Sequence, residues 1–239
     1  MSHLSTHSVA PRSSSVPIVT IDGPSGSGKG TISRLVARHA GWHLLDSGAL
    51  YRLVALSGIH EGLDPQDEAA HARLALSMDV DFGISPDGSE CVLLSGKDVT
   101  AEVRSEIGGQ GASRVAAYPQ VRQALLERQK AFGRPPGLVA DGRDMGTVVF
   151  PSADLKVFLT ASPDERALRR YKQLKDKGSD VSLAALSREI AERDLRDSTR
   201  AVAPLKPASD AEVIDSTGLS IEGVVDRVLA LGRSRSLWS

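Results

Sequence analysis

The chain contains no asparagine and only one cysteine among its 239 residues. Without asparagine it cannot carry the Asn-Lys-x-Asp motif with which GTPases read guanine, nor the catalytic-loop asparagine of protein kinases. The lone cysteine, Cys91, excludes an internal disulfide framework and agrees with a reducing cytoplasm, which is where we expect the protein. Its alternating strand pattern favours a small, half-buried side chain over a reactive thiol.

Aromatic residues and net charge are also scarce. Aromatics make up 4% of the chain and the formal net charge is -1, so neither base stacking nor a general electrostatic pull predicts a nucleic-acid partner. No apolar run approaches the ~20 residues of a membrane span, and we expect no membrane partner. Residues 1–15 are rich in Ser and His without an apolar signal core, so we expect a disordered tail rather than a secretion signal.

The most informative segment present is a glycine-rich loop between an apolar run and a helix-patterned stretch. Glycines let successive backbone N–H groups point at phosphate oxygens, and the following helix adds the positive end of its dipole. Lys29 would reach the β- and γ-phosphates of a triphosphate, and Thr31 is placed to help hold Mg²⁺. The loop consists of Gly23, Pro24, Ser25, Gly26, Ser27, Gly28, Lys29, Gly30 and Thr31.

This loop is a variant of the usual phosphate-binding pattern, because Gly30 stands where Ser or Thr normally follows the lysine. Its context supports the interpretation, since Ile32, Leu35 and Val36 follow with the spacing of a one-sided helix. A dinucleotide-binding fingerprint is disfavoured, because Thr31 stands where a third glycine would be needed.

Strand-like apolar runs alternate with helical stretches and predict a parallel sheet covered on both faces. Helix starts are predicted after Ser162 and Ser220. Two segments interrupt the alternation: residues 79–99 predict an antiparallel hairpin with a turn at 86–88, and residues 166–200 predict two charged helices around a mobile loop at 177–180. The predicted strands are residues 18–21, 42–45, 138–140, 155–159 and 212–214.

Polar groups follow two of these strands, and the carboxyl ends of parallel strands are where open α/β sheets bind ligands. Ser47 and Arg52 follow the second strand; Ser47 is either a helix cap or a binding group, and Arg52 either a surface arginine or a phosphate ligand. Arg143 and Asp144 follow the third strand and suit a phosphate and a base amino group. In the charged arm Arg166, Arg169 and Arg170 share a helix face, as do Arg193, Arg196 and Arg200. Such arginines are either a solvated face or the charge needed to neutralise a transferring phosphoryl group.

Taken together, these stretches resemble the bacterial cytidylate kinases, the CMP/dCMP kinases of the nucleoside monophosphate kinase family. The resemblance runs in order from about residue 16 to residue 231, and the Lys-Gly-Thr variant of the loop is typical of that family. It rests on Ile-Asp-Gly-Pro-Ser-Gly-Ser-Gly-Lys-Gly-Thr (21–31), Leu-Leu-Asp-Ser-Gly-Ala-Leu-Tyr-Arg (44–52), Ala-Asp-Gly-Arg-Asp-Met-Gly-Thr-Val-Val-Phe-Pro (140–151), Glu-Arg-Asp-x-Arg-Asp (192–197) and Arg-Ala-Val-Ala-Pro-Leu (200–205).

The resemblance implies an α/β P-loop fold of three layers with a five-stranded parallel core sheet, a monophosphate-binding insert that contains a β-hairpin, and a short helical lid. The core would comprise residues 16–62, 134–165 and 201–232. The monophosphate-binding domain would be 63–133 with its antiparallel insert at 79–99, the lid and arm 166–200, and the tails 1–15 and 233–239.

The resemblance also implies roles for individual residues. ATP would bind residues 23–31, with phosphate contacts from Arg166, Arg169 and Arg170 of the lid, and Lys29, Arg143 and Arg193 would be catalytic. Ser113, Arg122 and Asp144 would read cytosine, while Arg193 and Asp197 would hold the ribose. The CMP phosphate would be bound by Ser47, Arg52, Arg143 and Arg200.

The expected reaction is direct in-line transfer of the γ-phosphoryl group of ATP to CMP or dCMP, assisted by Mg²⁺, in a monomer. Two alternatives stay open at this point. One is a kinase for another nucleoside monophosphate or a small metabolite, which would share the loop but need a different acceptor site. The other is a non-catalytic ATP-binding switch, which the polar segment 141–146 and the arginine-rich arm argue against.

Overall fold

The computed structural model describes residues 16–84, 90–176 and 178–238. The predicted tail at 1–15, the hairpin turn at 86–88 and position 177 of the predicted loop lie outside the described residues. Five parallel strands form the core sheet, and each overlaps one of the predicted apolar runs, although β2 begins one residue later than the predicted run at 42–45. In sheet order they are β2 (His43–Asp46), β6 (Leu138–Gly142), β1 (Ile18–Asp22), β7 (Leu155–Thr160) and β8 (Glu212–Asp215).

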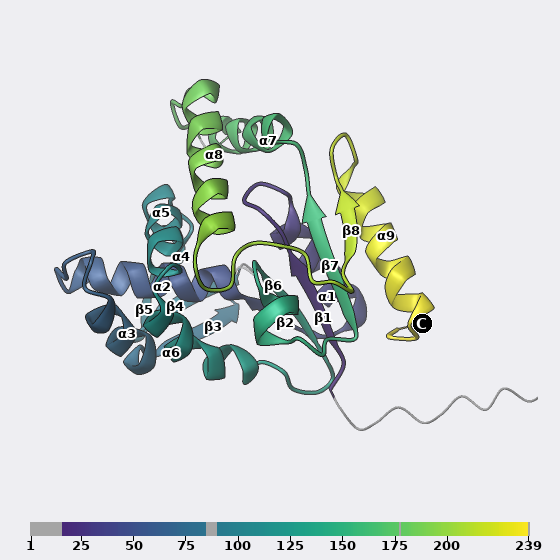
Figure 1. Cartoon of the computed structure of the whole chain (residues 1–239), viewed down its shortest axis with the longest axis horizontal. Coiled ribbons are helices and arrows are strands. Elements are labelled where there is room, and N and C mark those ends of the chain that lie inside the picture. The colour runs from purple at the N-terminus through teal and green to yellow at the C-terminus, as the bar shows by residue number, and fades with distance from the viewer. Residues whose placement is uncertain (1–15, 85–89, 177, 239) are drawn as a thin grey trace, which may run out of the picture.

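Helices cover both faces of this sheet, as Figure 1 shows, because alternate strand residues point to opposite sides. On one face α1 (Lys29–Ala40) and α9 (Ile221–Ser234) pack against residues such as Val139 and Val157. On the other face α2 (Ser47–His60) packs against Leu138 and Ala140. The α/β architecture with a five-stranded parallel sheet is therefore confirmed.

The described residues between 47 and 130, which include α2, form a side unit at the left in Figure 1. The predicted hairpin is present as β3 (Val80–Ile84) and β4 (Glu90–Leu94), and a short third strand, β5 (Lys97–Asp98), pairs with β4. The helices of this unit are α2, α3 (Glu68–Ser77), α4 (Thr100–Val103), α5 (Glu106–Val115) and α6 (Pro119–Lys130).

Two helices, α7 (Pro163–Asp176) and α8 (Leu183–Thr199), form the charged arm above the sheet in Figure 1. The predicted Ser162 cap is present, since its Oγ accepts the N–H of Glu165 at 3.2 Å. Ser220 likewise caps α9 through the N–H of Gly223 at 3.1 Å. Before α2 the cap is Asp46, which accepts from Ala49, while Ser47 is the first helical residue.

The C-terminal residues pack onto the core, where the sequence suggested a tail from residue 233. Helix α9 continues to Ser234, and the indole Nε1 of Trp238 donates to the carbonyl of Leu229 at 3.0 Å. The Trp238 ring meets Trp42 edge-on with ring centroids 5.4 Å apart. Among the described residues, no helix combines the length and apolar character needed to span a membrane.

Candidate active site

The glycine-rich loop joins β1 to α1 in a conformation that requires its glycines. A Cβ on Gly23 would lie 2.0 Å from the carbonyl oxygen of Leu159, so no side chain fits there. Gly28 occupies the N-cap of α1 with a φ of 92°, and neither a side-chain cap nor an acidic first-turn residue is present. The positive end of the α1 dipole is thus left for an anion that is not part of the protein.

Lys29, the first residue of α1, is buried beside this loop. Its Nζ donates to the carbonyl of Pro24 at 3.4 Å, a long hydrogen bond for an ammonium group. Burial lowers the pKa of Lys29 to about 8, and repulsion from Arg143 lowers it further while Asp141 acts in the opposite direction. A phosphate group bound at the loop would give this ammonium group a negatively charged partner and raise its pKa.

Two buried carboxylates end the neighbouring strands β1 and β6. Asp22 accepts hydrogen bonds from the N–H groups of Met145 and Gly146, and burial raises its pKa to about 7. Burial likewise raises the pKa of Asp141 to about 6, although Lys29 opposes the shift. The Oδ1 atom of Asp141 is buried and has no hydrogen-bond partner among the described residues. Its Oδ2 lies 3.2 Å from where a Cβ of Gly30 would be, so glycine at that position leaves room for the carboxylate.

The predicted base-reading residues come together at the end of β6. Asp144 forms a buried ion pair with Arg122 of α6, whose guanidinium lies 5.7 Å from the ring centroid of Tyr51. Arg200 approaches the other carboxylate oxygen of Asp144 at 3.9 Å. These contacts join the strand end, α6 and the segment after α8 into one polar cluster.

A second cluster connects the strand end to α8. Nε of Arg143 donates to Oδ2 of Asp197 at 3.0 Å, and the hydroxyl of Ser113 donates to Oδ1 of the same carboxylate at 3.4 Å. Burial alone would raise the pKa of Asp197, but Arg143 and Arg193 together hold it below its ordinary value. Asp197 is therefore ionised and fixed at the junction of three elements.

Several of the predicted arginines crowd together without enough negative charge nearby. The guanidinium groups of Arg52 and Arg193 both lie within 3.7 Å of the position that a Cβ on Gly109 would take. Burial lowers the pKa of Arg193 to about 9, and repulsion from Arg143 adds to this effect. The pKa of Arg52 is lowered for the same two reasons, and Nε of Arg193 has no hydrogen-bond partner in the described part of the chain. Such mutual repulsion would be relieved by a bound polyanion.

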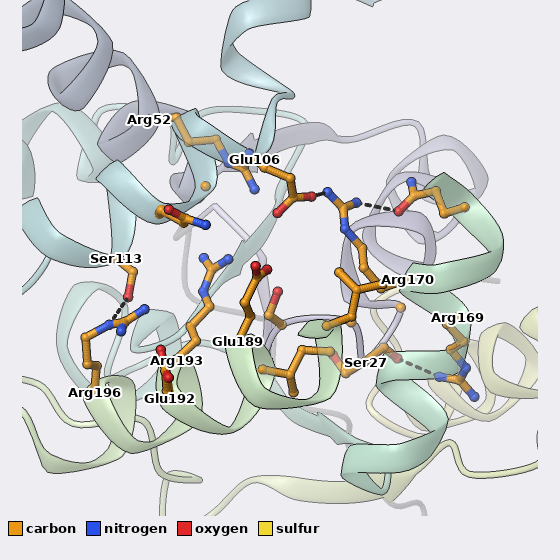
Figure 2. Close-up of a pocket in the computed structure, with 18 of the residues that line it drawn as sticks. Ser27, Arg52, Glu106, Ser113, Arg169, Arg170, Glu189, Glu192, Arg193 and Arg196 are labelled. Atoms are coloured by element: carbon orange, nitrogen blue, oxygen red, sulfur yellow. Dashed lines mark hydrogen bonds and ion pairs between the residues drawn. The ribbon is translucent and has the colours of Figure 1, made fainter. Parts of the chain in front are cut away.

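The three predicted lid arginines take different directions. Arg166 and Arg169 donate to carbonyl oxygens of the glycine-rich loop, at Ser25 (3.1 Å) and Ser27 (3.3 Å) respectively. Arg170 instead extends from α7 toward α5, where it pairs with Glu106 (Figure 2). Only Arg170 of the three is thus directed away from the loop backbone.

Ser47, the first residue of α2, lies at the carboxyl edge of the sheet, where its hydroxyl donates to the carbonyl of Asp141 in β6 at 2.8 Å. Beyond it, a cavity of about 990 Å³ extends from the loop to α5 and α8, with Arg52, Arg170 and Arg193 directed toward it (Figure 2). The sequence interpretation did not include several residues that line this cavity. They are Glu106, Gln110, Glu189, Glu192 and the segment 219–221 before and at the start of α9.

These additional residues had little signal in the sequence. Glu189 and Glu192 lie on a charged helix whose acidic positions resemble an ordinary solvated face. The segment before α9 follows the last strand of the sheet. Its place at the carboxyl edge, where open α/β sheets bind ligands, was the one indication that it could line the site.

Comparison with known proteins gives a consistent result. A protein-family model described as cytidylate kinase matches residues 19–234. A cytidylate kinase of Stutzerimonas stutzeri (strain A1501) is 60% identical over 223 residues, which cover 93% of this chain and 97% of that protein. A cytidylate kinase of Shewanella denitrificans is 59% identical over 214 residues, covering 89% and 94% respectively. One of Aeromonas hydrophila is 57% identical over 214 residues, covering 90% and 93%.

Proposed function

Because this chain belongs to the cytidylate kinase family, we propose that it transfers the γ-phosphoryl group of ATP to the 5′-phosphate of CMP and dCMP. The products are ADP with CDP or dCDP. The observation that carries the proposal is the crowding of cations between the glycine-rich loop and α8, where burial and repulsion from Arg143 lower the pKa values of both Lys29 and Arg193. Two phosphate-bearing substrates that meet there would neutralise this charge.

The donor side of the site suits a triphosphate. Residues 23–28 offer their backbone around the uncapped N-terminus of α1, and Lys29 is a buried ammonium group at its first turn. We assign ATP to residues 23–31, with its γ-phosphate toward Lys29 and the arginine cluster.

The acceptor side suits a nucleoside monophosphate. Arg52, Arg143 and Arg200, with Ser47 below them, would bind its phosphate. Arg193 and the ionised Asp197 would hold the sugar, since a carboxylate accepts from ribose hydroxyls. The ion-paired cluster of Ser113, Arg122 and Asp144 would read the base, because a carboxylate can accept from the amino group of cytosine and a guanidinium can donate to its carbonyl.

This arrangement needs no strong general base, because the acceptor phosphate is already an anion. The rate would come from positioning the two phosphates in line and neutralising their charge. Helices α7 and α8 would exclude water, which otherwise competes as the acceptor.

The residues beside the loop fit a Mg²⁺ ion that arrives with ATP. The unpartnered Oδ1 of Asp141 is an oxygen ligand of the kind Mg²⁺ prefers, and Thr31 lines the adjoining cavity. No group of three or more His, Cys, Asp or Glu in the described ranges could hold a metal by itself, which agrees with an ion held largely by phosphates. Thr31 and Asp141 would hold the ion, and bound Mg²⁺ would supply charge neutralisation at the phosphate oxygens.

We also propose that the enzyme is a monomer that works in the cytoplasm. All the side chains assigned to both substrates come from one chain, so no second copy is needed to complete the site. Cys91 is a free cysteine, which agrees with a reducing compartment.

The test is an acceptor panel read by coupled ADP release with ATP and Mg²⁺. CMP, dCMP, UMP, AMP and shikimate are compared at equal concentrations. We expect turnover with CMP and dCMP to exceed that with AMP and shikimate by at least about a hundredfold. Preference for AMP or shikimate would point to the other kinase classes, and ATP binding without acceptor-stimulated ADP release would point to a binding module.

A further inference from the structure

Arg166, at the start of α7, is almost completely buried and uses most of its donors on the protein itself. Its Nε donates to the carbonyl of Ala161, directly after β7, at 3.0 Å. Its Nη1 donates to the carbonyl of Ser25 in the glycine-rich loop at 3.1 Å. The bond to Ser25 holds the guanidinium against a backbone oxygen of the loop, whereas a phosphate would be bound by the N–H groups of the loop.

The same guanidinium forms a two-point ion pair with Asp194 of α8. Nη1 lies 3.1 Å from Oδ1 and Nη2 lies 2.5 Å from Oδ2, the fork geometry that arginine makes with a carboxylate. Asp194 stands directly after Arg193 and three residues before Asp197, the two residues assigned to the sugar. One side chain therefore ties the donor loop to the helix that carries acceptor contacts.

Packing reinforces this link. Gly26, at the tip of the loop with a φ of +78°, would place a Cβ 3.1 Å from the Cβ of Arg166. The loop tip thus rests directly on the first turn of α7, and a side chain at position 26 would push the two apart.

We propose that Arg166 and Asp194 are positioning residues, which hold the glycine-rich loop and α8 in the relative placement needed for in-line transfer, and that Arg166 does not contact phosphate. This inference rests on the proposed function. A phosphate contact would require Arg166 to give up hydrogen bonds to Ser25 and Asp194 that it makes while almost fully buried. Arg170, which extends into the cavity, is the α7 arginine free of loop contacts (Figure 2).

The two roles are separated by a double-mutant cycle made of Arg166→Lys, Asp194→Asn and the double variant. Arg166→Lys keeps the positive charge but loses the fork, while Asp194→Asn leaves Arg166 intact. Asp164→Asn, an exposed position on the same helix, is the matched control. The readouts are kcat with CMP, KM for ATP and for CMP, and the Kd of ATP by calorimetry.

If the pair acts as a brace, each single variant loses kcat by about ten- to a hundredfold. The kcat of the double variant is then no lower than that of the less active single variant, because both substitutions break the same ion pair. If Arg166 instead binds phosphate independently of Asp194, Asp194→Asn stays within about threefold of wild type, or the two losses multiply. Either of these results overturns the proposal.

Hydrogen exchange supplies a measurement that does not depend on activity. In nucleotide-free Arg166→Lys, whose folding is checked by circular dichroism, we expect faster amide exchange both in residues 25–28 and in residues 190–197. Unchanged exchange in both segments together with a lowered kcat would contradict a positioning role. Absence of CMP turnover in the wild-type panel would instead refute the proposed function, so the two failures are distinguishable.

Discussion

The carboxylate of Asp22 accepts a 2.8 Å hydrogen bond from the backbone N–H of Gly146, 124 residues further along the chain. Asp22 stands immediately before the glycine-rich loop, whereas Gly146 follows Asp144, the proposed base-reading residue, by two positions. A second bond from the N–H of Met145 completes the contact at 2.9 Å. One buried carboxylate thus fixes the start of the glycine-rich loop relative to the segment that carries Arg143 and Asp144, the proposed acceptor contacts.

This carboxylate makes stability depend on pH. The folded pKa of Asp22 is about 7, above its ordinary 3.8, so between about pH 4 and 7 the folded protein holds a proton that the unfolded chain releases. The free energy of unfolding therefore falls as pH rises through this window, by an amount on the order of 4 kcal/mol from this group. We expect Asp22→Asn to remove that part of the slope when urea unfolding is measured between about pH 5 and pH 8.

Asp141 also makes the free energy of unfolding fall as pH rises, because burial raises its pKa to about 6. This contribution is present in wild type and in Asp22→Asn alike. The comparison therefore uses the difference between wild type and Asp22→Asn rather than either curve alone. Asp226→Asn, at an exposed position of α9, controls for the general effect of removing a carboxylate. Parallel pH curves for wild type and Asp22→Asn would show that Asp22 ionises normally in the folded protein.

Lys29→Ala tests the phosphate-binding role of the loop. Removing the ammonium group leaves the γ-phosphate without its closest lysine, so we expect kcat to fall by at least about a hundredfold. Because the substitution also removes a buried charge, the free energy of unfolding is not expected to fall. Lys130→Ala, which removes an exposed lysine paired with Glu127, is the control. Near-normal turnover of Lys29→Ala would refute this role.

The sequence predicted the five strands of the sheet because parallel core strands are largely apolar runs, of which 138–140 is an example. It also placed Arg143 and Asp144 at the ligand-binding edge, since both directly follow such a run. Spacing could not predict the directions of the α7 arginines. Arg166, Arg169 and Arg170 share a face, but which group each one meets depends on how the glycine-rich loop lies against that face.

The hydrogen-bond partners of the Asp22 carboxylate could not be predicted from the sequence either. Its partners are backbone N–H groups more than a hundred residues away, and backbone donors carry no residue-type signal. Glu106 illustrates a further case, because an acidic residue in the first turn of α5 is fully explained by the helix dipole. Its contact with Arg170 follows only from the placement of the arm over the side unit.

Trp238→Ala tests whether the C-terminal residues stabilise the core without serving the site. The substitution removes the ring contact with Trp42 and the hydrogen bond to Leu229, so we expect the free energy of unfolding to fall by about 2 kcal/mol. Activity should be unchanged at low temperature, because Trp238 packs near the end of α1 that lies farthest from the glycine-rich loop. Trp238→Phe keeps an aromatic ring and should lose only about 1 kcal/mol. Chemical unfolding measures both, and equal losses would show that the ring contact contributes nothing.

Asp144→Ala tests base recognition. Because Asp144 pairs with Arg122 and lines a smaller pocket apart from the cavity beside the glycine-rich loop, we expect the Kd of CMP to rise by at least about tenfold while the Kd of ATP stays unchanged. The variant leaves the Arg122 guanidinium buried without its partner, which costs about 3–5 kcal/mol of stability. Calorimetry must therefore be normalised to the folded fraction from circular dichroism.

Asp144→Asn separates charge from shape in the same experiment. The amide keeps the size of the side chain but gives it a donor as well as an acceptor, so it fits the amino group of cytosine less well and the carbonyl of uracil better. We therefore expect the ratio of CMP to UMP turnover to fall for Asp144→Asn, whereas a residue that only supports the fold would lower both rates alike. Because ATP is assigned to residues 23–31 and Asp144 lines a separate, smaller pocket with Arg122, the KM for ATP should be the same in wild type and in both variants. If the variants lost affinity for ATP and for CMP equally, Asp144 would be a residue that supports the structure of both binding sites and does not contact the base.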